Sequence, residues 1–199
     1  MNYLAHAYLS FGHPGTLVGN LVSDFVKGRK QYDYPPDIRK GITLHRLIDD
    51  YTDAHAATAE AKAVFRPAYR LYSGAFVDVV YDHFLATDEQ EFPPGALAQF
   101  AQQVYAVLSD HIGQVPPRFG QLFPYMQSQN WLLHYSSRQG IAGSMRGLVR
   151  RALYLTESET AFQLFEQHYQ LLQQCYRQFW KDIRPFARAQ YELLHAGRP

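Results

Sequence analysis

Hydrophobic residues recur along most of the chain at intervals of three and four positions, the spacing of one face of an α-helix. We find no convincing run that alternates apolar and polar residues and is rich in β-branched side chains, as a strand requires. With 199 residues, of which 47% are hydrophobic, the chain is long enough for one substantial core and short for two. The pattern therefore predicts an all-α fold, a single-domain helical bundle over residues 1–199.

Prolines and glycines divide this pattern into separate helices. Gly12 and Pro14 should end the first helix, and Gly28 should be the C-terminal cap of the second. Pro185 should bend or end the last. We expect helices over residues 2–11, 16–27, 36 or 37 to beyond 51, 73–86 and 95–111, around 131 and 145, and from about 157 to near 185.

Polar side chains fall on or beside the apolar stripes of two of these helices. In the second helix, Asn20 and Asp24 are placed to face inward. In the third, His45 and Asp49 are four residues apart, so both side chains can reach one point in space. A buried carboxylate is costly unless it is paired, hydrogen-bonded or bound to a cation. Each of these positions therefore needs a partner.

The same kind of residue occurs in two further segments. Asp78 and Asp82 repeat the four-residue spacing in the helix over 73–86, where His83 lies on a different side. His6 belongs to an otherwise apolar helix. Each residue alone has an ordinary explanation. Asp24 could be held by Asn20 or a helix terminus, Asp82 by a salt bridge to Arg46, and His6 could be a hydrogen-bonded core histidine.

Recurrence of inward Asp and His residues in at least three helices favours a shared metal site. The chain has nine histidines but a single cysteine, Cys175, so the ligands would be nitrogen and oxygen. Such ligands suit Mn²⁺, Mg²⁺ or Fe²⁺ better than a structural zinc ion. A divalent cation that clamps phosphate oxygens and activates water supports attack on phosphorus. The residues thus point to phosphoester hydrolysis.

Charge points to a local partner rather than to a polyanion. The net charge is only +1, which favours neither duplex nucleic acid nor an anionic membrane surface as a partner. Basic residues gather in two segments, either as solvated helix ends or as docking surfaces for an acidic partner. The first holds Lys27, Arg29, Lys30, Arg39, Lys40 and Arg46, and the second holds Arg146, Arg150 and Arg151.

The N-terminal segment has no basic stretch or small-residue cleavage site, and no apolar run approaches the length of a membrane span. We therefore expect a cytoplasmic protein.

Five segments resemble, in order and spacing, those of the acyl carrier protein phosphodiesterase family. They are Asn-Tyr-Leu-Ala-His over 2–6, Gly-Asn-Leu-Val-Ser-Asp-Phe-Val-Lys-Gly over 19–28, Gly-Ile-Thr-Leu-His-Arg-Leu-Ile-Asp over 41–49 with Thr52-Asp53, Tyr-Asp-His-Phe-Leu-Ala over 81–86, and Pro-Pro-Arg over 116–118. Together they are specific, although no single one is. The length of the chain suggests that the resemblance covers all of it.

The resemblance implies an unusual, HD-domain-like branch of the metal phosphohydrolases, helical and Mn²⁺-dependent. Its reaction is hydrolysis of the phosphodiester between a carrier-protein serine and 4'-phosphopantetheine, which gives apo-acyl carrier protein and free 4'-phosphopantetheine. Holo-acyl carrier protein, which is small and acidic, would then be the partner of the surface formed by Lys27, Arg29, Lys30, Arg39 and Lys40.

Carried over to this sequence, the resemblance makes Asp24, His45, Asp49 and Asp82 candidate ligands and catalytic residues, with His6 and His83 as further candidate ligands. Arg46 becomes a candidate phosphate contact, and Asn20 and Asp53 become candidate supports. One feature departs from the pattern that names the HD superfamily. The chain has no adjacent His-Asp pair and instead has Asp82-His83 in the reverse order.

Two other functions fit the same residues. A related phosphohydrolase could act on a nucleotide or another small phosphoester without a protein substrate. A non-catalytic helical module could bind acyl carrier protein and use its inward carboxylates only for buried hydrogen bonds; it would bind no divalent metal. The sequence leaves the oligomeric state open.

Overall fold

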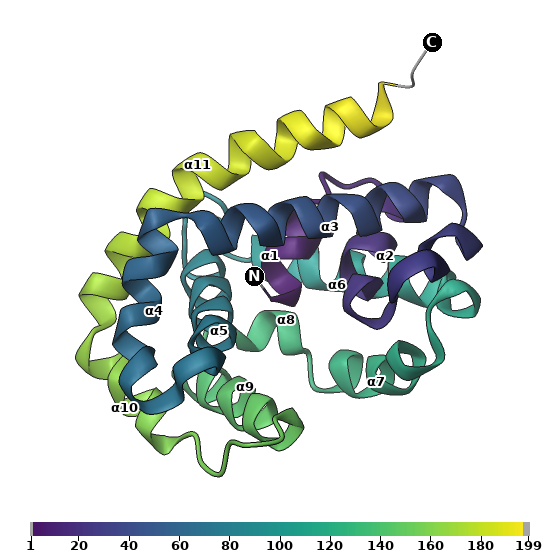
Figure 1. Cartoon of the computed structure of the whole chain (residues 1–199). Coiled ribbons are helices and arrows are strands. Elements are labelled where there is room, and N and C mark those ends of the chain that lie inside the picture. The colour runs from purple at the N-terminus through teal and green to yellow at the C-terminus, as the bar shows by residue number, and fades with distance from the viewer. Residues whose placement is uncertain (1, 197–199) are drawn as a thin grey trace.

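Helices joined by short turns make up the computed structural model, which describes residues 2–196 and contains no strand within them (Figure 1). The all-α prediction is confirmed. Residues 1 and 197–199, which the predicted domain includes, lie outside the described part. The α-helices are α1 (Tyr3–Tyr8), α2 (Pro14–Val22), α3 (Pro36–Ala54), α4 (Ala56–Tyr69), α5 (Ser73–Ala86), α6 (Ala96–Asp110), α7 (Pro117–Ser128), α8 (Trp131–His134), α9 (Arg138–Arg151), α10 (Glu159–Gln167) and α11 (Tyr169–His195). The 3₁₀ turns are η1 (Ser23–Phe25), η2 (Gly28–Asp33), η3 (Arg70–Tyr72) and η4 (Ile112–Gln114).

The core forms around α3 and α5. Helix α3 packs between α2 and α11, and α5 is covered by α1, α4 and α9. In Figure 1, α11 runs along the outside of the molecule past α4 and α3, and its C-terminal end projects beyond them. None of the described helices is both long and apolar enough to span a bilayer.

Two glycines bring α2 and α3 together at backbone distance. A Cβ atom on Gly19 would lie 1.9 Å from the carbonyl oxygen of Ile38, and one on Gly41 would lie 2.2 Å from that of Thr16. Only glycine therefore permits this crossing. The close approach positions Asn20, which follows Gly19, against His45, which lies one turn after Gly41.

Helix α2 is shorter than predicted and begins earlier. Pro14 starts the helix instead of ending the previous one, because a proline at the first position loses no hydrogen bond and His13 supplies a cap by accepting from the Thr16 N–H. The helix ends at Val22 instead of residue 27. Gly28 has a φ of 54° but opens η2 and caps no helix. Residues 23–27 consequently leave the helical path.

The other boundaries agree in part with the predictions. The expected helices over 73–86 and 95–111 are confirmed, whereas α4 and α7 were not predicted. The long C-terminal helix is divided at His168 into α10 and α11. Pro185 neither ends nor divides α11, because it lies on the exposed side of the helix, where the carbonyl it leaves unpaired faces water.

Candidate metal centre

Two histidines from separate helices stack against each other inside the molecule. His6 of α1 and His45 of α3 are 2% and 6% exposed, and their ring centroids are 4.0 Å apart. The Nδ1 atom of each ring lies 2.7 Å from an oxygen of Asn20, the side-chain Oδ1 for His6 and the backbone carbonyl for His45. Because these oxygens accept, both Nδ1 atoms carry hydrogen. Each Nε2 atom of the neutral rings is left with a lone pair.

Asn20 fixes this arrangement through its whole side chain. Its Nδ2 atom donates to the backbone oxygen of His6 at 2.8 Å and to Ser10 Oγ at 3.1 Å, so its Oδ1 atom must face the His6 ring. The sequence predicted Asn20 as an inward support, and the structure gives it that position. Hydrogen bonds of this kind at the far nitrogen of a metal-binding histidine set its tautomer and orientation.

The two Nε2 atoms converge on the carboxylate of Asp49. His6 Nε2 lies 3.2 Å from Asp49 Oδ1, and His45 Nε2 lies 3.1 Å from Asp49 Oδ2. These contacts lack hydrogen-bond geometry, so both nitrogens are buried without a hydrogen-bond partner among residues 2–196. A native fold rarely leaves two such atoms side by side. One ligand atom from each of the three residues lies within 4.8 Å of the others, a spacing that a single cation can bridge.

The charges of this cluster also suit a cation. Burial and the neighbouring His45 lower the pKa of His6 to about 4. Burial acts in the same direction on His45, but the carboxylates of Asp24 and Asp49 outweigh it and raise that pKa to about 9. Burial would raise the pKa of Asp49, yet the two histidines hold it well below its usual range. Without a cation, His45 therefore holds a proton on Nε2 and the two carboxylates still leave the site net negative; a bound cation would replace that proton.

Comparison with known proteins identifies the family to which this sequence belongs. The sequence model of the family described as acyl carrier protein phosphodiesterase matches residues 1–183. This chain belongs to that family. An acyl carrier protein phosphodiesterase of Yersinia pestis is 37% identical over 184 residues, which cover 92% of this chain and 95% of the relative. Proteins of the same name from Photorhabdus laumondii (33% identical over 181 residues, 90% and 91% covered) and Escherichia coli O139:H28 (33% over 199 residues, 98% and 100%) are also similar. No solved structure matches the chain.

The acyl carrier protein phosphodiesterase resemblance is thus confirmed, and an enzyme of this kind is supported. The placement of the family among the HD-domain phosphohydrolases stays a prediction. Three of the matched segments, those that contain His6, Asn20 and His45 with Asp49, supply the cluster described above.

Asp24 lies at the rim of the cluster and not inside it. Its side chain is 78% exposed, and its Oδ1 atom is 3.4 Å from His45 Nε2. The sequence predicted that Asp24 would face inward as part of α2. It does not, because α2 ends at Val22 and η1 turns the Asp24 side chain toward solvent. The contact with the His45 ring lowers the pKa of Asp24, which keeps it ionised.

Arg46 holds the segment that carries Asp24. Its guanidinium donates to Gln31 Oε1 at 2.8 Å and to the backbone oxygen of Val26 at 3.2 Å. These contacts join α3 to the chain on both sides of Lys27. In the structure, Arg46 therefore holds residues 26–31 against α3. Its contact with phosphate stays a prediction.

The structure places Asp82 outside the group formed by His6, His45 and Asp49. Asp82 is completely buried and accepts from the backbone N–H groups of Leu4 at 2.8 Å and Ala5 at 3.1 Å. Its carboxylate thereby caps the N-terminal end of α1. Burial raises its pKa to about 7 in spite of these two donors. The expected salt bridge between Asp82 and Arg46 is not formed.

His83 is also engaged elsewhere. Its Nδ1 atom donates to the backbone oxygen of Tyr135 at 2.7 Å, and its Nε2 atom lies 3.1 Å from the Tyr169 hydroxyl. Both ring nitrogens are thus used in joining α5 to α8 and α11. Asp78 lies four residues before Asp82 on α5. Burial raises its pKa, and the negative charge of Asp49 adds to this effect. Asp53 pairs with Lys62 at 2.6 Å on the surface.

The predicted basic surface lies directly after Asp24. Lys27, Arg29 and Lys30 are exposed on η2 and the residue before it. Arg39 and Lys40, on the first turn and a half of α3, are half-buried, and Lys40 forms an ion pair with Asp37 at 2.9 Å. The basic surface and the rim of the histidine cluster therefore belong to one continuous stretch of chain.

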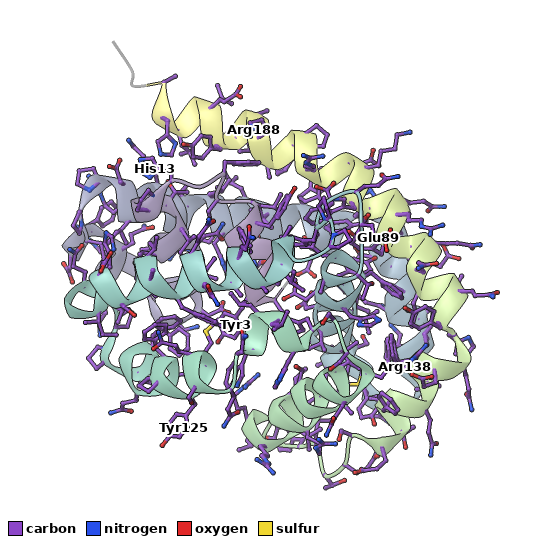
Figure 2. The ribbon with its side chains drawn as sticks, turned by 180° about the vertical axis from the view of Figure 1, so that it is seen from behind. Tyr3, His13, Glu89, Tyr125, Arg138 and Arg188 are labelled. Carbon is purple, nitrogen blue, oxygen red and sulfur yellow. The ribbon has the colours of Figure 1, made fainter. Side chains whose placement is uncertain are left out.

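A second group of possible ligands links α11 to α2 and α3. It consists of His13, Asp37 and His195. His13 accepts the Thr16 N–H through Nδ1, so its Nε2 atom carries the hydrogen in the neutral ring and offers no lone pair. His195 Nε2 lies 3.1 Å from the Thr16 hydroxyl. These bonds explain the group as a contact between helix ends, and in Figure 2 His13 lies beside the C-terminal half of α11.

Proposed function

We propose that this chain is a metal-dependent phosphodiesterase that hydrolyses the bond between 4'-phosphopantetheine and the serine of holo-acyl carrier protein. The observation that carries the proposal is the pair of buried Nε2 atoms of His6 and His45, which converge on Asp49 and have no hydrogen-bond partner in the described part of the chain. Membership of the acyl carrier protein phosphodiesterase family supports the choice of reaction and substrate. The products would be apo-acyl carrier protein and free 4'-phosphopantetheine.

Three residues of the cluster, His6, His45 and Asp49, would bind the cation. His6 and His45 each offer their Nε2 atom. Asp49 offers Oδ1 beside the His6 ring and Oδ2 beside the His45 ring. Asp24 faces solvent beside His45, where substrate enters. Its lowered pKa makes it a weak proton acceptor, which favours a role as a ligand. When bound, a divalent cation would supply a Lewis acid for the phosphate and lower the pKa of a water molecule.

The nitrogen and oxygen donors fit Mn²⁺, with Mg²⁺ or Fe²⁺ as alternatives. Holo-acyl carrier protein would dock on the basic surface that follows Asp24, where exposed lysine and arginine side chains steer an acidic partner. We propose neither nucleic acid nor a membrane as partner. We place the reaction in the cytoplasm, with which the single unpaired cysteine is compatible.

Mass spectrometry of purified holo-acyl carrier protein tests this function. After incubation with this protein and Mn²⁺, the carrier protein should lose the mass of the phosphopantetheinyl group, and excess chelator should prevent the loss. An unchanged mass in the presence of a bound metal would redirect the assignment to a small phosphoester. An unchanged mass and no bound metal would leave a binding module for acyl carrier protein.

A further inference from the structure

A cavity of about 480 Å³ opens between α1, α8 and α9. Its volume falls within the range of about 300–1,000 Å³ that is usual for small-molecule sites. Three aromatic residues form one part of the wall, Tyr3, Trp131 and Tyr135, and the ring centroids of the first two are 6.3 Å apart. Arginine side chains from α9 form another part, namely Arg146, Arg150 and Arg151. The cavity therefore combines an apolar wall with strong positive charge.

Tyr3 joins this cavity to the metal centre. It lies one turn before His6 on α1, and Figure 2 shows it near the middle of the face seen from behind. Burial raises the pKa of Tyr3 to about 12, Arg151 acts to lower it, and Asp24 acts to raise it. The phenol is thus within electrostatic reach of a carboxylate at the rim of the metal centre and of a guanidinium in the cavity wall. A ligand could extend from one to the other past Tyr3.

Two glycines of α9, Gly143 and Gly147, leave the cavity open without being required by packing. A Cβ atom on Gly143 or Gly147 would meet only the far end of an arginine side chain, at 3.8 Å in each case. At Gly140, by contrast, it would lie 1.9 Å from the backbone oxygen of His134. Each helical glycine costs about 1 kcal/mol relative to alanine. At Gly143 and Gly147 no protein atom accounts for that cost, whereas room for a ligand does.

Polar groups in the wall suit a chain that contains amides. The Trp131 indole N–H donates to Gln129 Oε1 at 3.0 Å, which fixes the ring and leaves the amide nitrogen of Gln129 as a donor. Gln139 and Ser144 also line the cavity. These side chains offer donors and acceptors next to an aromatic surface. Such a wall can bind a flexible ligand with methyl, amide and hydroxyl groups.

We propose that this cavity, the α9 cavity, receives the pantetheine part of the prosthetic group while the phosphate lies at the metal centre. This inference rests on the proposed function. Hydrolysis breaks the bond between phosphorus and the serine oxygen, forms a bond from phosphorus to a water oxygen, and leaves a proton on the serine. The phosphate that remains on pantetheine gains negative charge, which a divalent cation held at the metal centre would stabilise. The carrier protein docks on the basic surface after Asp24. The arm then extends from the metal centre past Tyr3 into the α9 cavity.

Filling the cavity tests the inference. Gly147→Leu adds a side chain where only the Arg151 guanidinium is near, and it favours the helix, so the variant should fold with an unchanged melting temperature or a higher one. Gly113→Leu is the matched control, because it is an exposed glycine with no atom within 4 Å of an added Cβ and lies outside the cavity wall. Calorimetry would measure binding of free 4'-phosphopantetheine, pantetheine and inorganic phosphate to each protein.

Gly147→Leu should weaken binding of 4'-phosphopantetheine and pantetheine at least tenfold, raise KM for holo-acyl carrier protein, and leave phosphate binding unchanged; Gly113→Leu should behave as wild type. Wild-type affinities in Gly147→Leu, together with an unchanged KM, would overturn the cavity assignment alone. The cavity assignment is also wrong if the unmodified protein binds 4'-phosphopantetheine no more tightly than inorganic phosphate. In either case, continued cleavage of holo-acyl carrier protein would show that the proposed function survives.

Discussion

Among single residues, Asn20 has the largest number of tasks in the metal centre. Its side chain orients His6 and its backbone oxygen orients His45. Asn20→Ala removes only the first of these hydrogen bonds, so we expect metal affinity to fall by about 10- to 100-fold, the usual cost of losing such a partner. A competition titration with a metal indicator would measure the change. Ser10→Ala, which removes the bond to the Asn20 amide and one to the His6 backbone oxygen but leaves both imidazole hydrogen bonds in place, should have a smaller effect. Equal affinities in Asn20→Ala and wild type would refute the role.

His83 should contribute to the pH dependence of stability. It is 3% exposed, and burial lowers its pKa below the unfolded value of about 6.5. The unfolded chain therefore takes up the proton more readily, so stability from this group is present above about pH 6.5 and is lost as the pH falls through the folded pKa. Urea unfolding should show a free energy that decreases below about pH 6.5, and less steeply in His83→Gln. An equal slope in both proteins would contradict this explanation.

Helical spacing alone brings candidate ligands together only where they lie on the same helix, whereas His6 became a candidate through the family resemblance. His45 and Asp49 are one turn apart, and the helical period alone brings their heads together. The position of Asp24 could not be predicted, because it depends on where α2 ends. The capping role of Asp82 depends on N–H groups 77 and 78 residues away in the chain, for which no local pattern exists.

At the scale of elements, the crossing of α2 and α3 determines the geometry of the centre. Gly41→Ala would place a methyl group 2.2 Å from a backbone oxygen, so the two helices must separate. We expect a loss of about 3 kcal/mol or more in the free energy of unfolding, together with weaker metal binding. Gly113→Ala, at an open position, should leave both unchanged. Denaturant unfolding measures the first quantity, and wild-type stability in Gly41→Ala would show that the helices lie further apart.

The junction of α1 and α5 gives a different prediction. Asp82→Ala leaves two N–H groups of α1 unpaired in the core, which should destabilise the fold by about 2–4 kcal/mol. Because Asp82 caps a helix and lies outside the converging ligands, the folded variant should keep metal affinity within about tenfold of wild type. Thermal unfolding and metal titration of the same sample separate the two effects. If the variant stays folded but loses metal binding, Asp82 is a metal ligand and this explanation is wrong.

Elements with strong periodicity and clear ends were predictable, such as α5 and α6. The errors arose where tertiary contacts override the local signal. Pro14 starts a helix because His13 caps it, and Pro185 is tolerated inside α11 because it faces water. Helix α4 has few large apolar residues, and its buried face of Ala57, Ala61 and Phe65 is too weak a pattern to recognise without its neighbours.

In the whole molecule, three features meet around the histidine cluster. The basic surface follows Asp24 in the chain, Tyr3 of the α9 cavity wall lies one turn before His6, and Arg46 of α3 holds the segment that carries Asp24. A protein substrate that carries a flexible arm needs such a division between a docking surface, a reaction centre and a cavity. No single segment of the sequence encodes it, because its parts come from α1, η2, α3, α8 and α9.

The most direct test of the account is the metal affinity of the purified protein and of four variants. We predict that wild type binds a divalent cation and that His45→Ala and Asp49→Asn bind it at least about 100-fold more weakly, because each loses a ligand atom while the fold persists. Asp82→Ala and His83→Gln should bind within about tenfold of wild type. If wild type binds no divalent cation, or if loss of His45 and Asp49 leaves the affinity unchanged, the cluster is not the metal centre.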